Sequence, residues 1–231
     1  MKKLASVLAL ALTLSLVLTA CGSKEETPAP STTPSTSTST TTPEASAPAE
    51  GEYVWRTSAD NKVVSENGTF GKDQISGSVL VTSIGQSADV SMLDALMKKV
   101  GAEYTFNATA SADEVANCGT LILASGAASK GRGAAGISQE DELARAQAIV
   151  DTCKDKGIVV IAAHLGGSAR RGALSDQFND MALTCANYII VVEEGNDDGK
   201  FTDAAVDKGI PVTLVNSIAD TLTPLTDLFG A

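Results

Sequence analysis

The sequence predicts an α/β protein, a three-layer sandwich around a mostly parallel sheet of five or six strands. Short runs rich in β-branched residues recur from residue 78 onward, and segments with apolar residues at helical spacing separate them. Most of the runs are continuously apolar rather than alternating, which is typical of strands buried on both faces. Because right-handed crossovers place helices against the sheet, we expect helices on both of its faces.

Six segments are expected to form the strands. In chain order they span residues 78–82, 103–106, 120–124, 158–163, 188–192 and 211–215. A flavodoxin-like and a Rossmann-like strand order fit this succession equally well.

The segments between the strands carry helix start and stop signals. Ser111 and Glu114 have the spacing of a capping box, and Ser138 can cap a longer helix. Gly101 and Gly157 stand where a left-handed residue commonly ends a helix. A last helix is expected to begin at Ser217. The apolar stripes expected in the core are Val90, Leu93, Met97, Leu143, Ala146, Ile149, Val150, Cys153, Phe178, Met181, Ala182, Cys185, Ile218, Leu222, Leu225 and Phe229.

The chain begins with a pattern typical of a secretory signal peptide. Lys2 and Lys3 precede an apolar run over residues 4–18, and Leu18-Thr19-Ala20-Cys21 is similar to a bacterial lipobox. We therefore interpret residues 1–20 as a lipoprotein signal peptide and Cys21 as the lipidated residue. The alternative, an uncleaved membrane anchor, is disfavoured because the run is shorter than the roughly 20 residues that span a bilayer.

Three further regions follow the signal peptide. Residues 21–51 are rich in Ser, Thr, Pro and Ala and predict a disordered linker, because they cannot bury enough apolar surface to offset the entropy of ordering. Residues 52–77 lack a clear period and are interpreted as an N-terminal extension with a short hairpin around Glu66-Asn67-Gly68. Residues 78–231 form the predicted α/β domain, displayed outside the cytoplasm and tethered to the membrane.

Charge and cysteine content exclude several kinds of partner. The formal net charge is −11, a surface that repels nucleic acid and anionic lipid, so only the lipid anchor is expected to contact the membrane. Besides Cys21 the thiols are Cys118, Cys153 and Cys185, an odd number at no metal-ligand or disulfide-framework spacing. We interpret them as small core residues, with a disulfide between two of them as the open alternative.

The candidate site lies at the carboxyl ends of the predicted strands, where ligands bind in open parallel sheets. Three of the chain's five arginines, Arg132, Arg170 and Arg171, follow two of these strands, with Lys130 beside them, and neither loop contains an acid. Glycine-rich backbone and helix N-termini would add positive potential there. These features predict a site for a carboxylate, phosphate or sulfate group.

The only histidine, His164, stands at a strand end and is interpreted as a polar contact, a proton donor or a structural residue. The alternative for the arginines is that Arg170 or Arg171 pairs with Glu193 or Glu194 of the neighbouring loop and leaves no free charge. The complete expected binding set is Ser83, Gln86, Ser125, Lys130, Arg132, His164, Arg170, Arg171 and Glu193.

The sequence contains no complete motif for binding ATP, calcium or zinc. Gly131-Arg132-Gly133 replaces the Gly-Lys-Ser/Thr of a P-loop, so ATP binding is not predicted. The last ligand of a calcium loop that began at Glu194 would fall on Ala205, and a single histidine without a CxxC pair gives no support to zinc. We therefore expect neither a metal nor a cofactor.

Four stretches of the sequence, TSIGQSADV, SKGRGAAGIS followed by ELARA, AAHLGGSARRGALSDQF and IIVVEEGNDDGKFT, resemble an uncharacterised family of extracytoplasmic bacterial lipoproteins whose domain has no known function. The resemblance extends from about Ser78 to the end of the chain. It implies a single α/β domain displayed outside the cell, and it implies no activity or catalytic residue.

Three functions are compatible with these residues. The favoured one is a tethered protein that binds a small anionic molecule or a cell-envelope fragment. The first alternative is an extracytoplasmic hydrolase with His164 as base, which requires a serine or carboxylate within hydrogen-bonding reach of the imidazole. The second alternative is a protein-interaction module, for which an exposed apolar patch would be the sign.

Overall fold

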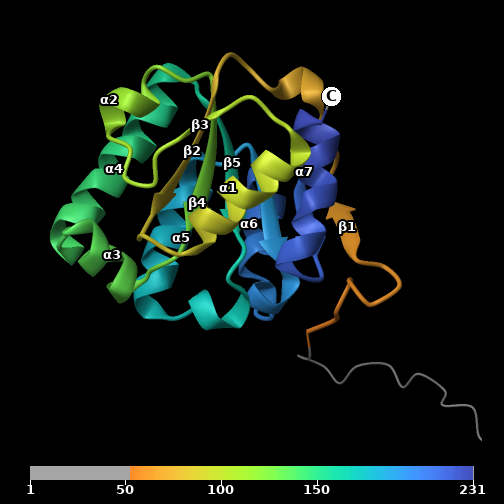
Figure 1. The fold of residues 1–231 in the computed structure, drawn as a ribbon. Coiled ribbons are helices and arrows are strands. Elements are labelled where there is room, and N and C mark those ends of the chain that lie inside the picture. The colour runs from red at the N-terminus through yellow and green to blue at the C-terminus, as the bar shows by residue number, and fades with distance from the viewer. Residues whose placement is uncertain (1–52, 231) are drawn as a thin grey trace, which may run out of the picture. The chain divides into compact units, whose positions relative to one another are not determined.

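The computed structural model describes residues 53–230, and the predicted signal peptide, Cys21 and linker lie outside this part of the chain. The described residues form a mixed α/β structure with a seven-stranded, mostly parallel sheet in the order β1-β7-β6-β5-β4-β2-β3 (Figure 1). The strands are β1 (Val63–Glu66), β2 (Val79–Ile84), β3 (Thr105–Phe106), β4 (Thr120–Ser125), β5 (Val159–His164), β6 (Tyr188–Val192) and β7 (Val212–Val215).

The predicted α/β class and the mostly parallel sheet are confirmed, but the expected number of five or six strands is wrong. The seventh strand, β1, comes from the N-terminal extension and runs antiparallel to β7, with Val63 opposite Val215. The hairpin expected at Asn67 and Gly68 does not form. Both residues have positive φ, as in a turn, but the Asn67 side chain donates to the carbonyls of Ala205 in α6 and Ile210 in the α6–β7 connection.

Residues 53–230 contain seven α-helices, of which the last follows β7 and the others lie between strands. They are α1 (Asp89–Val100), α2 (Ala112–Val115), α3 (Ser129–Ala135), α4 (Gln139–Lys156), α5 (Ala173–Cys185), α6 (Lys200–Lys208) and α7 (Leu222–Phe229). Four short 3₁₀ turns lie in the connections between these elements: η1 (Lys72–Gln74), η2 (Gly167–Arg170), η3 (Glu193–Asn196) and η4 (Ile218–Thr221).

Most of the predicted helix ends are confirmed. Gly101 and Gly157 adopt the left-handed conformation at the ends of α1 and α4, and Ser111 and Glu114 form a reciprocal capping box. The last helix was placed too early, because residues after Ser217 first form the 3₁₀ turn η4 and α7 begins at Leu222.

Two apolar clusters lie on opposite faces of the sheet. Alternate residues of each strand point to opposite faces, so in β4 Leu121 and Leu123 join one cluster while Ile122 joins the other. Helices α2, α4, α5 and α6 cover the first face, and α1 and α7 cover the second. This burial on both faces explains why the strand sequences are continuously apolar.

Candidate functional site

The carboxyl ends of the parallel strands lie at one edge of the sheet, and the strand order reverses at β2, which has β3 on one side and β4 on the other. The loops after β2 and β4 are joined by their backbones. Gln86 and Ala127 form an antiparallel bridge, and the Ala128 amide donates to the Gly85 carbonyl over 2.9 Å. These contacts fasten the two loops to each other at the carboxyl ends of β2 and β4.

A buried ion pair supports the loop after β2. The Glu142 carboxylate, fully buried on α4, accepts from the Gly85 amide at 2.7 Å and from the Arg145 guanidinium at 2.7 and 2.9 Å. Arg145 also donates to the carbonyls of Ser83 and Ala110. Sequence reasoning placed neither charge at the site, although their spacing of three residues at the start of a helix is a signal for an i, i+3 pair.

The neutral residues of the predicted site are mostly engaged with the protein itself. Ser83 Oγ donates to the Ala108 carbonyl at 3.0 Å, and Ser125 Oγ donates to Asn179 Oδ1 at 2.8 Å. The Gln86 amide donates to the Ala108 carbonyl at 3.2 Å and to Glu142 at 3.3 Å. All three side chains are buried. These contacts hold the loops in place.

His164 is 1% exposed and stacks on Phe201, with ring centroids 4.9 Å apart. Its Nδ1 lies 3.2 Å from the Ser125 carbonyl oxygen and its Nε2 lies 3.2 Å from that of Gly167. Burial lowers the pKa of the imidazole, so the neutral form, which carries a single N–H and donates to one of these carbonyls, predominates at neutral pH.

Arg171 is neutralised, by partners that differ from the Glu193 and Glu194 of the sequence interpretation. Its guanidinium donates to Asp176 at 2.8 Å and to Asp198 at 2.6 and 2.9 Å, and it also donates to the Gly195 carbonyl. The hydrogen bonds that Arg171 donates to Asp198 raise the pKa of Arg171 and lower the pKa of Asp198 to about 2.

Glu193 holds the N-terminal extension. Its buried carboxylate accepts from the amides of Arg56 and Thr57 at 2.7 and 2.6 Å and from the Tyr53 hydroxyl at 3.1 Å. The neighbouring Glu194 is exposed and accepts from Ser168 Oγ at 2.8 Å. Neither acid forms an ion pair with Arg170 or Arg171.

The remaining cations of the predicted set lack such partners. Among residues 53–230, Arg132 and Arg170 form no ion pair, and each has a buried guanidinium nitrogen without a hydrogen-bond partner, Nη1 of Arg132 and Nε of Arg170. Arg132 is 8% exposed. Lys130, which precedes it on α3, is exposed.

Both arginines border the bridged loops. A Cβ placed on Gly126 would lie 3.6 Å from Arg170 Cβ and 3.7 Å from Ser87 Cβ, so the Arg170 side chain begins beside these loops. On the α3 side, a Cβ on Gly131 would lie 2.0 Å from the Gln86 carbonyl oxygen. The backbone of Gly131, which precedes Arg132, therefore packs against the loop after β2. We call Lys130, Arg132 and Arg170 the arginine rim.

A cavity of about 380 Å³ opens at the same edge, beyond β5, β6 and β7. Its lining includes Gly166, Glu194 and Asn216. Asp89, at the start of α1, lies next to Gly166, because a Cβ on Gly166 would be 2.8 Å from Asp89 Oδ2. This buried Oδ2 has no hydrogen-bond partner in the described structure. Sequence analysis missed Asp89, because an acid in the first turn of a helix is ordinary.

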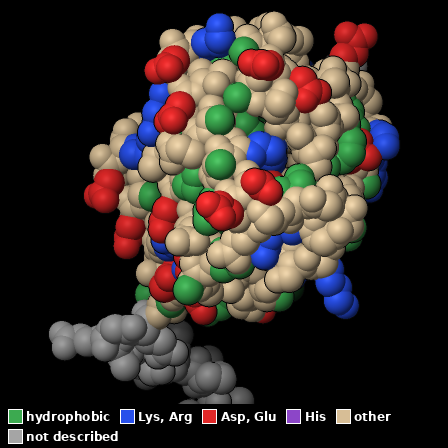
Figure 2. All heavy atoms as spheres, turned by 90° about the vertical axis from the view of Figure 1, so that its left-hand side faces the viewer, with side chains coloured by type: hydrophobic (Ala, Val, Ile, Leu, Met, Phe, Trp, Pro, Cys, Tyr) green, Lys and Arg blue, Asp and Glu red, His purple; other side chains and the backbone are tan. Residues whose placement is uncertain are grey.

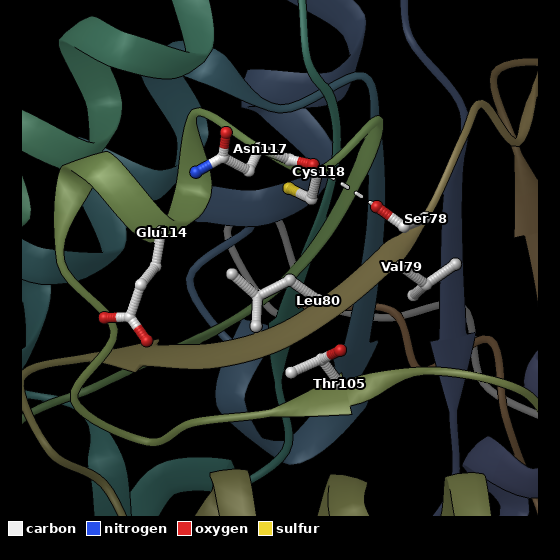
Figure 3. Close-up of a pocket in the computed structure, with 7 residues that line it drawn as sticks. All are labelled: Ser78, Val79, Leu80, Thr105, Glu114, Asn117 and Cys118. Carbon is white, nitrogen blue, oxygen red and sulfur yellow. Dashed lines mark hydrogen bonds between the residues drawn. The ribbon is translucent and has the colours of Figure 1, made fainter.

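A second pocket, of about 250 Å³, lies at the opposite, amino-terminal end of β2. Figure 3 shows that Leu80 and Cys118 border it, with Glu114 on its far side. This pocket contains none of the predicted site residues. The predicted site residues follow the carboxyl ends of the strands, at the other end of the sheet from this pocket.

The described residues also restrict other kinds of site. No group of three His, Cys, Asp or Glu side chains within residues 53–230 is arranged to hold a metal ion. In the same range, no helix combines the length and the apolar character of a membrane span. On the face that bears α2, α3 and α4, acidic and basic side chains are interspersed and hydrophobic side chains form only small separate areas (Figure 2).

Comparison with known proteins gives a family and no activity. A search of curated proteins found no match to the chain. A family model described as a domain of unknown function, DUF6305, matches residues 76–229, which span all strands except β1 and include the arginine rim. The chain therefore belongs to the DUF6305 family.

Proposed function

We propose that this protein binds a small anionic ligand at the arginine rim, on a domain held outside the cytoplasm by a lipid on Cys21. The observation that carries the proposal is the pair of guanidinium groups of Arg132 and Arg170, each with a buried nitrogen and no ion-pair partner among residues 53–230. A buried charge without a partner costs several kcal/mol, and an anion with good acceptor geometry would offset that cost.

The chemistry of the rim favours a carboxylate, phosphate or sulfate group. Guanidinium groups present planar sets of donors that match the oxygens of such anions. Lys130 adds a mobile positive charge at the surface. Arg171, by contrast, is already surrounded by Asp176 and Asp198, so we assign it to the framework of the loop rather than to the ligand.

The strand order supports the location of this site. We infer a three-layer sandwich of the flavodoxin-like type. The parallel strands β3-β2-β4-β5-β6-β7 follow the order 2-1-3-4-5-6 when renumbered along the chain, which is the flavodoxin-like order with one more strand at its end. A Rossmann-like order would instead place the third parallel strand beyond the second. In flavodoxin-like sheets ligands bind at the carboxyl ends of the first and third strands, here β2 and β4, which the rim borders.

The tether remains a proposal from the sequence. The signal peptide at residues 1–20 and Cys21 imply an extracytoplasmic, membrane-anchored protein, with the linker as spacer. The ligand would then be a small solute or a fragment of the cell envelope. A hydrolase with His164 as base has no supporting contact, because the imidazole nitrogens face two backbone carbonyls rather than a hydroxyl or a carboxylate.

Thermal-shift measurements with phosphate, sulfate and citrate test the proposal. A ligand at 100 times its Kd should stabilise the protein by about 2.7 kcal/mol, or roughly 5–10 °C for a domain of this size. The variants Arg132→Met and Arg170→Met should both abolish the shift. Arg132→Met should also raise the Tm of the ligand-free protein, because it removes an unpaired buried charge. Lys156→Met, an exposed change at the end of α4, is the matched control. Shifts that are equal in wild type and in both arginine variants would refute the proposed site.

A further inference from the structure

Three of the four cysteines of the chain gather in one apolar cluster. Cys118, Cys153 and Cys185 all belong to the cluster beneath α2, α4 and α5, although 32 or more positions separate each from the next along the chain. All three are free thiols. Sequence spacing gave no indication of this arrangement, because it arises from the packing of helices on one face of the sheet.

The fold places Cys153 and Cys185 at corresponding ends of neighbouring helices. Helices α4 and α5 pack against each other and lead into the adjacent strands β5 and β6, so their carboxyl ends meet at the amino-terminal edge of the sheet. Cys153 lies in the last turn of α4, and Cys185 is the last residue of α5. The two side chains interact, with opposite effects on the pKa values of the two thiols, and Cys185 Sγ also donates to the Ala182 carbonyl at 3.4 Å.

We propose that Cys153 and Cys185 form a reversible intramolecular disulfide by exchange with a low-molecular-weight disulfide of the glutathione type. In the first step the Cys185 thiolate attacks one sulfur of the small disulfide, which leaves a mixed disulfide on Cys185 and releases one small thiolate. In the second step Cys153, after losing its proton to solvent, attacks Cys185 Sγ and displaces the second small thiol. The protein loses two electrons and two protons, and the small disulfide is reduced to two thiols.

The surroundings of the two thiols assign these roles. Cys185 is only partly buried and can meet a small disulfide, whereas Cys153 is 2% exposed and needs to reach only its neighbour. Interaction with the Cys153 thiol lowers the pKa of Cys185, and the positive charges of Lys154 and Lys208 lower it further. Interaction with Cys185, together with burial, raises the pKa of Cys153. A thiol with a lowered pKa is the better first nucleophile.

The third thiol, Cys118, provides an internal control. It sits before β4, where its sulfur borders the pocket of Figure 3 beside Leu80, and its Sγ donates to the Val115 carbonyl at 3.2 Å. Burial raises the pKa of this thiol. We therefore expect Cys118 to remain reduced when the other two cysteines are linked.

Peptide mass mapping after oxidation tests the inference. The full chain, carrying Cys21→Ser so that the anchoring cysteine does not react, is reduced and incubated with oxidised glutathione, and free thiols are then blocked with iodoacetamide. The expected product links the peptides of Cys153 and Cys185 and leaves Cys118 alkylated. Dithiothreitol should reverse the link, and the oxidised protein should melt several degrees higher than the reduced one.

Two variants separate the steps. In Cys153→Ala the reaction should stop at glutathione bound to Cys185, and in Cys118→Ala the Cys153–Cys185 link should form as in the parent protein. Circular dichroism of each variant verifies that it is folded. The proposal is overturned if the parent keeps all three thiols, if Cys118 appears in the cross-link, or if the mixed disulfide on Cys185 persists in the presence of Cys153.

Discussion

Removing the buried carboxylate of Glu142 should destabilise the domain strongly. The carboxylate is fully buried and accepts hydrogen bonds from the Gly85 amide, the Gln86 side chain and the Arg145 guanidinium. Glu142→Ala would leave the Gly85 amide without its acceptor and the Arg145 charge without its counter-ion. Breaking a buried ion pair at one partner costs about 3–5 kcal/mol. For a domain of this size, that corresponds to a fall in Tm of roughly 6–20 °C.

Urea denaturation followed by circular dichroism measures this change directly. Glu140→Ala, two positions earlier on the exposed side of α4, is the matched control and should stay within about 0.5 kcal/mol of wild type. The double variant Glu142→Met, Arg145→Met should recover part of the loss, because it removes both charges. Recovery should be incomplete, since the carbonyls of Ser83 and Ala110 lose their donor. A loss below about 1 kcal/mol in Glu142→Ala would refute the role given to this ion pair.

Three further predictions concern packing and titration. Gly131→Ala should lower the Tm, because the new Cβ would lie 2.0 Å from the Gln86 carbonyl oxygen. In the control Gly133→Ala, on the same helix, the new Cβ meets nothing within 4 Å, so this change should stabilise the protein by about 1 kcal/mol. Equal changes in Tm would contradict the close approach at Gly131. Arg171 lowers the pKa of Asp198 from 3.8 to about 2, so this contribution is present above pH 4 and is lost as the pH falls toward 2. Asp198→Asn should therefore cost up to about 1 kcal/mol at pH 7, a small value because the Asp198 side chain is 54% exposed, and nothing at pH 2, as measured by urea titration at both pH values. The folded structure raises the pKa of all three tyrosines, Tyr53, Tyr104 and Tyr188. Absorbance at 295 nm should therefore show no tyrosine titrating at the usual pH of 10 in the folded protein. The free energy of unfolding should fall as the pH rises from 10 to 12.

The fold could be predicted where local chemistry and burial agree. Continuous apolar runs marked the central strands correctly, because each of those strands is buried on both faces. The glycines that end α1 and α4 were equally clear. Strand β1 was missed because Val63–Glu66 is short and only partly buried, and its formation depends on the free edge of β7 rather than on its own sequence.

The position of the candidate site follows from the sequence, but its contacts do not. The sequence indicated which loops gather at the carboxyl edge of the sheet, because parallel strands end there together. The sequence did not indicate which of the predicted side chains would be occupied by hydrogen bonds or ion pairs within the protein itself. Ser125 is held by Asn179, and Glu193 binds the backbone of residues 56 and 57, and both partners are distant in the sequence.

Arg170 and Arg171 illustrate this limit most clearly, since they are adjacent and chemically identical. Arg171 reaches Asp176 at the start of α5 and Asp198 beyond β6, and these carboxylates neutralise it. The Arg170 side chain packs over Gly166, where a Cβ would lie 1.9 Å from Arg170 Cγ, and its Nε remains buried without a partner. Side chains of successive residues in turn or extended backbone point in different directions. Arg171 therefore stabilises the loop through its ion pairs, whereas Arg170 has no ion-pair partner among residues 53–230, and this difference cannot be read from the residue type.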